Sequence, residues 1–111
     1  MTAAAFDFIL SSTSVTRQNM INLMSAFSLE QLNKIPSGFN NNLIWNFGHV
    51  VVTQQLLCYG LSGLPIQLDK EMIATYRKGG APTGAVDQAT LDAYKELSVS
   101  LLGQFKEDYK A

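Results

Sequence analysis

Cysteine and histidine are almost absent from this sequence, and each absence narrows what the chain can do. Cys58 is the only cysteine, so no internal disulfide can form and no oxidising compartment is required. His49 is the only histidine, so a Ser–His catalytic triad could use no other imidazole. A disulfide-stapled scaffold is therefore excluded, and any histidine chemistry of this chain rests on His49.

Charge is also scarce and evenly divided between the two signs. Eight basic and nine acidic residues give a formal net charge of −1, and there is no run of like charge. Proteins that bind nucleic acid or an anionic membrane surface usually carry a basic patch or stripe. We therefore expect neither nucleic acid nor a membrane as a partner.

Long hydrophobic runs are missing as well. The most apolar stretch, Leu43 to Leu57, contains Asn46, Thr53 and two glutamines, so it is too short and too polar to predict a membrane span. The first residues lack the basic segment of a signal peptide, and Asp7 interrupts the first apolar stretch. We expect a cytoplasmic protein.

Common nucleotide-binding and nucleophile motifs are absent too, including the phosphate loop, GxGxxG, CxxC and the GxSxG elbow. No alternation of useful length predicts a β-strand, and there is no internal repeat. What remains is a chain of 111 residues, 47% hydrophobic and only 15% charged, which is typical of one folded domain with a real core. We expect a single all-α domain over residues 1–111.

Three long segments have the spacing of amphipathic helices. The first is predicted over about Ala4–Phe27, and its apolar stripe consists of Phe6, Ile9/Leu10, Thr13, Thr16, Met20, Leu23/Met24 and Phe27. The second is predicted from about Leu43 to Tyr59, ending at Gly60; it has no charged residue and should lie in the middle of the assembly. The third begins near Asp87, with a stripe of Leu91, Tyr94, Leu97/Ser98, Leu101/Leu102 and Phe105.

Capping residues mark the starts of further elements. Ser28 followed by Gln31 is a capping-box pattern, which predicts a short helix from Leu29 to before Pro36. One of the three asparagines at 40–42 is expected to cap the second long helix. A second short helix, Lys70 to Tyr76, is predicted to be capped by Asp69. The long connection after Gly60 therefore contains some structure of its own.

The second long helix carries the most specific pattern in the chain. Its core is Trp45-Asn46-x-Gly48-His49, followed by an apolar helix and a Tyr-x-Leu-Ser-Gly-Leu-Pro loop. This pattern resembles the second helix of the DinB-like superfamily, and the other helices fall where that superfamily places them. The resemblance implies a four-helix bundle with a long crossover between its second and third helices. It also implies a zinc or nickel ion held by three histidines, which in relatives supports thiol S-transferase, maleylpyruvate isomerase or hydrolase-type chemistry.

The chain departs from that pattern at the metal site. His49 matches the ligand from the second helix, whereas the family's other two histidines come from a fourth helix that this chain does not reach. One imidazole cannot hold a catalytic zinc, which needs about three protein ligands. We therefore expect no metal for this chain alone, and we expect a second chain to complete the bundle as a homodimer.

Two interpretations of His49 stay open on sequence alone. In one it is the single candidate metal ligand, with Trp45, Val52, Thr53 and Leu56 lining the pocket around it. In the other it is a helix histidine whose ring is hydrogen-bonded to a backbone carbonyl or a side chain. No catalytic residue can be assigned.

The function hypotheses follow from these two interpretations. One is a DinB-like metalloprotein acting on a small molecule or a thiol, and the other is a catalytically silent bundle that works by self-association or small-ligand binding. Gly48 is expected to allow close approach of a neighbouring helix. Cys58 is expected to be a small buried hydrophobe.

Overall fold

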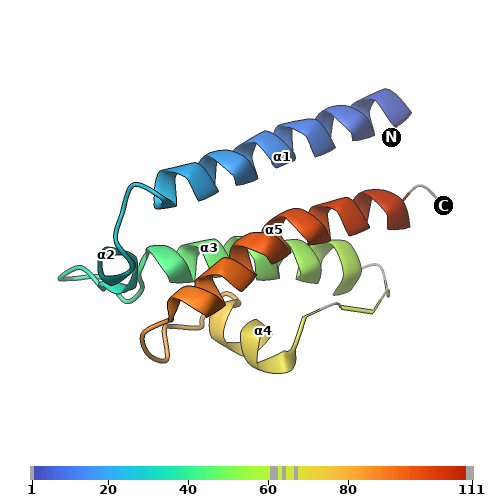
Figure 1. The fold of residues 1–111 in the computed structure, drawn as a ribbon. Coiled ribbons are helices and arrows are strands. Elements are labelled where there is room, and N and C mark those ends of the chain that lie inside the picture. Colours follow the sequence, from blue (N-terminus) through green and yellow to red (C-terminus); the bar gives the residue numbers. More distant parts are fainter. Residues whose placement is uncertain (1, 61–62, 64, 67, 110–111) are drawn as a thin grey trace.

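The computed structural model describes residues 2–60, 63, 65, 66 and 68–109, and within these residues there is no β-strand. The α-helices are α1 (Ala3–Met24), α2 (Leu29–Asn33), α3 (Leu43–Gln55), α4 (Lys70–Tyr76) and α5 (Gln88–Asp108). A π-helical turn, η1 (Leu56–Gly60), continues α3. The predicted all-α fold is confirmed, with three long helices and a long crossover between α3 and α5 (Figure 1).

The predicted capping residues define the helix starts. Ser28 and Gln31 form both bonds of the capping box at α2. Asn42 is the asparagine that caps α3, where its side-chain oxygen accepts the Trp45 N–H at 2.7 Å. Asp69 and Asp87 cap α4 and α5 in the same manner. Each such cap satisfies an otherwise orphaned backbone donor and is worth about 1 kcal/mol.

Helix α3 lies at the centre, as its lack of charge predicted. It packs on α2, α4 and α5, whereas α1 lies chiefly along α5 (Figure 1). Two apolar clusters hold this arrangement. One joins α3, α4 and α5 through Trp45, Val51, Val52, Met72, Tyr76 and Leu101. The other joins α1, α2, α3 and α5 through Met24, Leu32, Ile44, Phe47 and Leu91.

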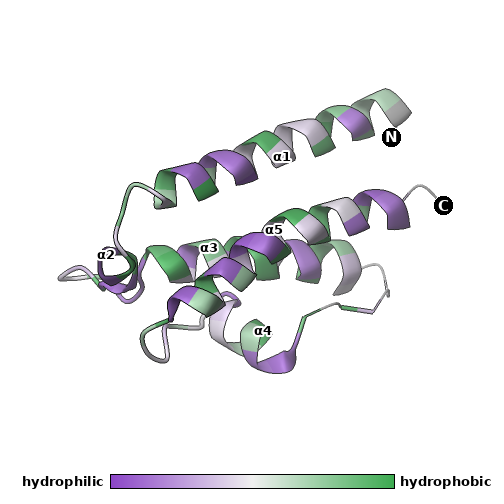
Figure 2. Cartoon of the chain, viewed as in Figure 1, coloured by the Kyte–Doolittle hydropathy of each residue, from purple (hydrophilic) through white to green (hydrophobic). Residues whose placement is uncertain are grey.

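The predicted stripe on α1 is wrong along one edge. Leu10 and Met24 are buried as expected, but Ile9, Leu23 and Phe27 are 45%, 66% and 42% exposed. The predicted stripe is broader than the surface that α5 covers, so Ile9 and Leu23 stay open, and Phe27 lies beyond the end of α1 at Met24. The buried face of α1 instead includes Arg17, which is only 7% exposed and was not part of the predicted stripe. Hydrophobic residues recur along α1 (Figure 2), and Phe8, Ile9, Val15 and Leu23 are the large ones that stay exposed on it.

The second long helix also ends differently from the prediction of a continuous α-helix to Tyr59. Its last turn is the π-helical segment η1, in which the helix widens while still ending at Gly60. Apolar spacing does not distinguish this turn from an α-helical one. Tyr59, 1% exposed, uses the altered geometry to donate its hydroxyl to Asp108 of α5 at 2.6 Å. The turn therefore ties the end of α3 to the end of α5.

Across the part of the chain that the structure describes, no helix combines the length and apolar character needed to cross a membrane. Much of the predicted Tyr-x-Leu-Ser-Gly-Leu-Pro loop, at positions 61, 62 and 64, lies outside the described residues.

Candidate functional site

The Trp-Asn-x-Gly-His motif docks the C-terminal end of α4 onto α3. The Trp45 indole Nε1 donates to the Thr75 carbonyl at 2.8 Å, and His49 Nδ1 lies 2.7 Å from the Tyr76 carbonyl oxygen. Both carbonyls belong to the last turn of α4, where no further backbone N–H of the helix can reach them. Two ring N–H groups of α3 thus satisfy carbonyls that would otherwise be orphaned.

Gly48 makes this docking possible. A Cβ at position 48 would lie 2.5 Å from the Tyr76 ring, far inside van der Waals contact. The ring of Tyr76 therefore rests directly on the α3 backbone, which confirms the predicted close approach of a neighbouring helix. The rings of Trp45 and His49 stack on each other, 4.9 Å apart with an interplanar angle of 10°.

The hydrogen bond to Tyr76 fixes the tautomer of His49. A carbonyl oxygen only accepts, so Nδ1 carries a proton, and in the neutral ring the lone pair is then on Nε2. Histidines that ligate metals are commonly oriented by such a bond from the other ring nitrogen. The geometry therefore suits both interpretations of His49: its Nδ1 is hydrogen-bonded to a backbone carbonyl, and Nε2 is the nitrogen that a ligand role would use.

The remaining donors do not fit the family's three-histidine site. Within the described residues no three His, Cys, Asp or Glu side chains come close enough together to hold a metal ion. Cys58 lies on η1, more than two helical turns along from His49. A single imidazole lacks the further ligands that zinc or nickel needs. No chemical step is therefore assigned to a metal here.

The other predicted pocket residues do not border the pocket described next. Val52 is fully buried in the cluster between α3, α4 and α5, and Leu56 packs against that cluster. Thr53 is partly buried. Trp45 alone among the predicted pocket residues borders the pocket described next.

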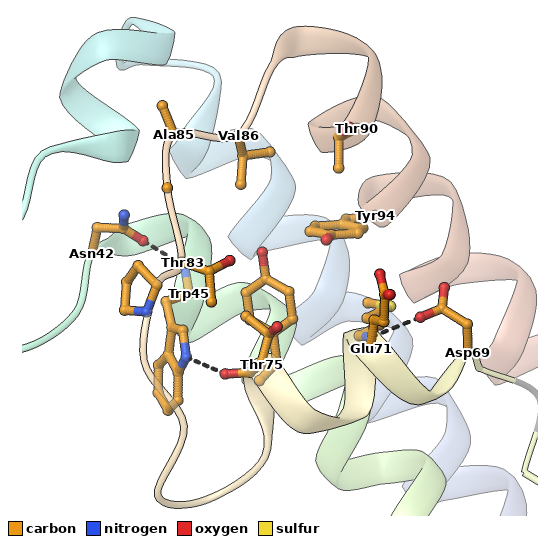
Figure 3. A pocket seen from close by; sticks show the side chains of 14 residues that line it. Asn42, Trp45, Asp69, Glu71, Thr75, Thr83, Ala85, Val86, Thr90 and Tyr94 are labelled. Atoms are coloured by element: carbon orange, nitrogen blue, oxygen red, sulfur yellow. Dashed lines mark hydrogen bonds between the residues drawn. The ribbon is translucent and has the colours of Figure 1, made fainter.

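A pocket of about 450 Å³ lies between α4, the segment 82–86 and the start of α5 (Figure 3). Its lining combines three aromatic rings, from Trp45, Tyr76 and Tyr94, with two carboxylates, from Asp69 and Glu71. None of the described residues that line it is a lysine, an arginine or a histidine. The remaining lining residues are small, polar or apolar: Asn42, Met72, Thr75, Pro82, Thr83, Gly84, Ala85, Val86 and Thr90.

The aromatic wall of this pocket is fixed by packing. The rings of Tyr76 and Tyr94 meet edge to face, 5.3 Å apart at 85°, and Figure 3 shows Tyr94 beside the two carboxylates. Burial raises the pKa of Tyr76 well above its usual value, and hydrogen bonding with Tyr94 raises it further. The Tyr76 hydroxyl is thus neutral at physiological pH, whereas no cation on the pocket wall offsets Asp69 and Glu71.

Sequence reasoning missed most of this pocket because it is built across the crossover. Tyr76 and Tyr94 are 18 positions apart, and neither belongs to a recognisable motif. A usable signal was the capped short helix, because a helix of seven residues buries enough surface only by packing on longer helices. The aromatic residue that ends it, Tyr76, was the natural candidate for that contact.

Comparisons with known proteins agree with this geometry at the level of the family. No significant match was found to a curated protein or to a solved structure. The family model of the DinB superfamily matches residues 12–111, which include all of the α3 motif, the crossover and α5. With its helical bundle and its Trp-Asn-x-Gly-His docking motif, this chain belongs to the DinB superfamily.

Proposed function

We propose that this DinB superfamily member is a small-ligand-binding bundle whose pocket between α4 and α5 takes an organic cation, such as an amine. The observation that carries the proposal is the lining of that pocket, three aromatic rings and two carboxylates without a basic residue. Aromatic faces attract cations through their quadrupole, and a carboxylate adds a direct ion pair. Its volume lies in the usual range for small-molecule sites.

The two carboxylates differ in how freely they can meet a ligand. One oxygen of Asp69 accepts the Met72 N–H at 2.7 Å, because Asp69 caps α4, so its second oxygen is the one that a ligand could use. Glu71 is exposed in the first turn of α4 and has no such structural role. Figure 3 shows both side chains at the same end of the pocket, near Tyr94. An amine held there would face the carboxylates and place its alkyl groups against the rings.

Calorimetric titration with tetramethylammonium and with ethylamine tests the proposal. We expect saturable binding that Glu71→Gln and Asp69→Asn each weaken about tenfold, since each removes one charged partner. Asparagine is as good a helix cap as aspartate, so Asp69→Asn removes the charge while keeping the start of α4. Glu30→Gln, in the equivalent first turn of α2, is the matched control and should bind as the unaltered protein does. Equal affinity in Glu71→Gln, Asp69→Asn and the unaltered protein would contradict the proposal.

The metal-dependent chemistry of the family is not part of this proposal, because the described donor set offers one imidazole. The test is metal analysis after incubation with zinc or nickel. If the unaltered chain binds stoichiometric metal and His49→Gln does not, ligands beyond those described complete a site around His49. The enzyme hypothesis would then replace the one proposed here.

Self-association is a second candidate, favoured by the uncovered apolar edge of α1. Ile9 and Leu23 lie on that edge and Phe27 follows the end of α1, and each is more than 40% exposed. A second copy of the chain could cover it as the homodimer expected from the sequence. Sedimentation equilibrium measures this directly: a monomer at all accessible concentrations contradicts it, and a dimer supports it.

A further inference from the structure

A buried arginine of α1 faces α5, outside the lining of the organic-cation pocket. Arg17 is only 7% exposed, and its one hydrogen bond to the described residues is long, 3.5 Å from Nη1 to the Ser98 carbonyl. A guanidinium has about five N–H donors, so most of its donors have no partner among the described residues. None of the carboxylates that the structure describes forms an ion pair with it.

The charge of Arg17 is costly in this position. Burial lowers the pKa of Arg17, and the effect that opposes it comes from Cys58, whose ionised form would raise that pKa. Burial also raises the pKa of Cys58, so that thiol is neutral near pH 7 and supplies no counter-charge. Buried charges in proteins are ordinarily paired, because leaving one uncompensated costs several kcal/mol. An anion from outside the chain would remove this cost.

A second buried polar side chain, that of Gln54, also lacks a partner among the described residues. Both the nitrogen and the oxygen of the Gln54 side-chain amide are buried, and neither has a hydrogen-bond partner among the described residues. Gln54 is two helical turns after Phe47, which packs with Met24 of α1, so Gln54 is on the face of α3 turned toward α1. It is also one turn before Cys58, the thiol that interacts with Arg17.

We propose that Arg17 and Gln54 form a binding site for a small oxyanion in the interior between α1, α3 and α5. The planar guanidinium matches two oxygens of a carboxylate or phosphate group, and the Gln54 amide can donate a further hydrogen bond. Burial strengthens these interactions relative to water. The site is separate from the organic-cation pocket and carries the opposite charge preference.

Thermal unfolding of the full chain in three buffers tests this. Sodium phosphate, sodium acetate and sodium chloride are compared at equal pH and ionic strength. We expect phosphate or acetate to raise the midpoint above that in chloride, by roughly 5 °C for each tenfold increase beyond the Kd. A larger effect of acetate identifies a carboxylate ligand, and a larger effect of phosphate identifies a phosphate group.

Arg17→Met separates binding from a structural role. Without the oxyanion, this variant should unfold at the same or a higher temperature in chloride, because an uncompensated buried charge is gone. The phosphate or acetate effect should disappear, whereas Arg77→Met, at an exposed arginine, should keep it. The proposal is overturned if the unaltered chain shows no oxyanion effect beyond chloride, if Arg17→Met retains that effect, or if Arg17→Met lowers the midpoint in chloride.

Discussion

The two sides of α3 meet their neighbours in opposite ways. Toward α4, ring N–H groups of Trp45 and His49 satisfy the carbonyls of the last turn of α4, and Gly48 lets Tyr76 rest on the backbone. Toward α1, the Gln54 amide has no partner among the described residues, and Arg17 has one long bond. The contact with α4 satisfies its polar groups within the chain. The α1 side leaves polar groups without partners among the described residues and apolar groups exposed, so both are open to a ligand or a second chain.

The difference between these two contacts indicates which one chiefly stabilises the fold and which one leaves groups free to bind a partner. Helix α4 is only seven residues long and would not form alone, so the close contact with α3 is what holds it and, with it, the organic-cation pocket. Helix α1 is 22 residues long and can tolerate an incomplete contact. Changes to the contact between α3 and α4 should therefore chiefly lower stability, and changes on the α1 side should chiefly affect oxyanion binding or association.

Trp45→Ala should have the largest effect on stability. It removes a side chain that is 7% exposed and also leaves the Thr75 carbonyl without its donor. We expect a loss of about 3–5 kcal/mol in the free energy of unfolding, measured by urea titration. Phe8→Ala on α1, where the ring is 72% exposed, is the aromatic control and should change it by less than about 0.5 kcal/mol. Similar losses in both variants would break the comparison.

Gly48→Ala should come next. The new methyl group would overlap the Tyr76 ring, so α4 must shift, at a cost of about 1–3 kcal/mol. Gly103→Ala on α5 is the matched control, since a Cβ there has nothing within 4 Å. That control should gain about 0.5–1 kcal/mol from helix propensity. A loss of stability in Gly48→Ala with a gain in Gly103→Ala would support the comparison. Equal gains in stability in both variants would show that Tyr76 of α4 does not rest on α3.

Tyr76 should make the α4 side sensitive to alkaline pH. Burial, and then hydrogen bonding with Tyr94, raise the pKa of Tyr76 above its ordinary value of 10.0. An acid with a raised folded pKa contributes stability that is complete below the unfolded pKa and is lost as pH rises toward the folded one. We expect stability to fall above pH 10, and to fall less steeply in Tyr76→Phe. Stability should still fall somewhat in Tyr76→Phe, because burial also raises the pKa of Tyr59. Equal dependence of stability on pH in the variant and the unaltered chain would contradict the role given to Tyr76.

Leu23→Gln should have the smallest effect. Leu23 is 66% exposed on the uncovered edge of α1, so within one chain the change should be worth less than about 0.5 kcal/mol. If two chains cover that edge, the same change should instead weaken their association in sedimentation. A large loss of stability in a strictly monomeric protein would show that this edge is covered from within the chain.

Local chemistry made much of the fold predictable. Ser28, Asp69 and the asparagine run mark helix starts because their side chains replace missing backbone partners, which sequence alone reveals. The close approach at Gly48 could be predicted for the same reason, since glycine in the middle of a helix is costly without a purpose. These predictions need no knowledge of distant residues.

What could not be predicted depends on partners far along the chain. Hydropathy predicts the buried face of α1 from apolar residues alone. It therefore cannot reveal that Arg17 packs inward beside Ser98, 81 positions away. The π-helical turn at Leu56–Gly60 fits the same apolar spacing as an α-helix. For His49, the motif indicated a ligand, yet only the position of the Tyr76 carbonyl identifies the nitrogen that carries the proton.

The stacking of Trp45 on His49 gives the protein a built-in optical probe. These are the chain's single tryptophan and single histidine, so indole emission comes from one place only. That place touches the end of α4 through the Thr75 carbonyl and also borders the pocket between α4 and α5. A change in emission without unfolding therefore signals either departure of α4 from α3 or entry of a ligand, and neither needs an attached dye.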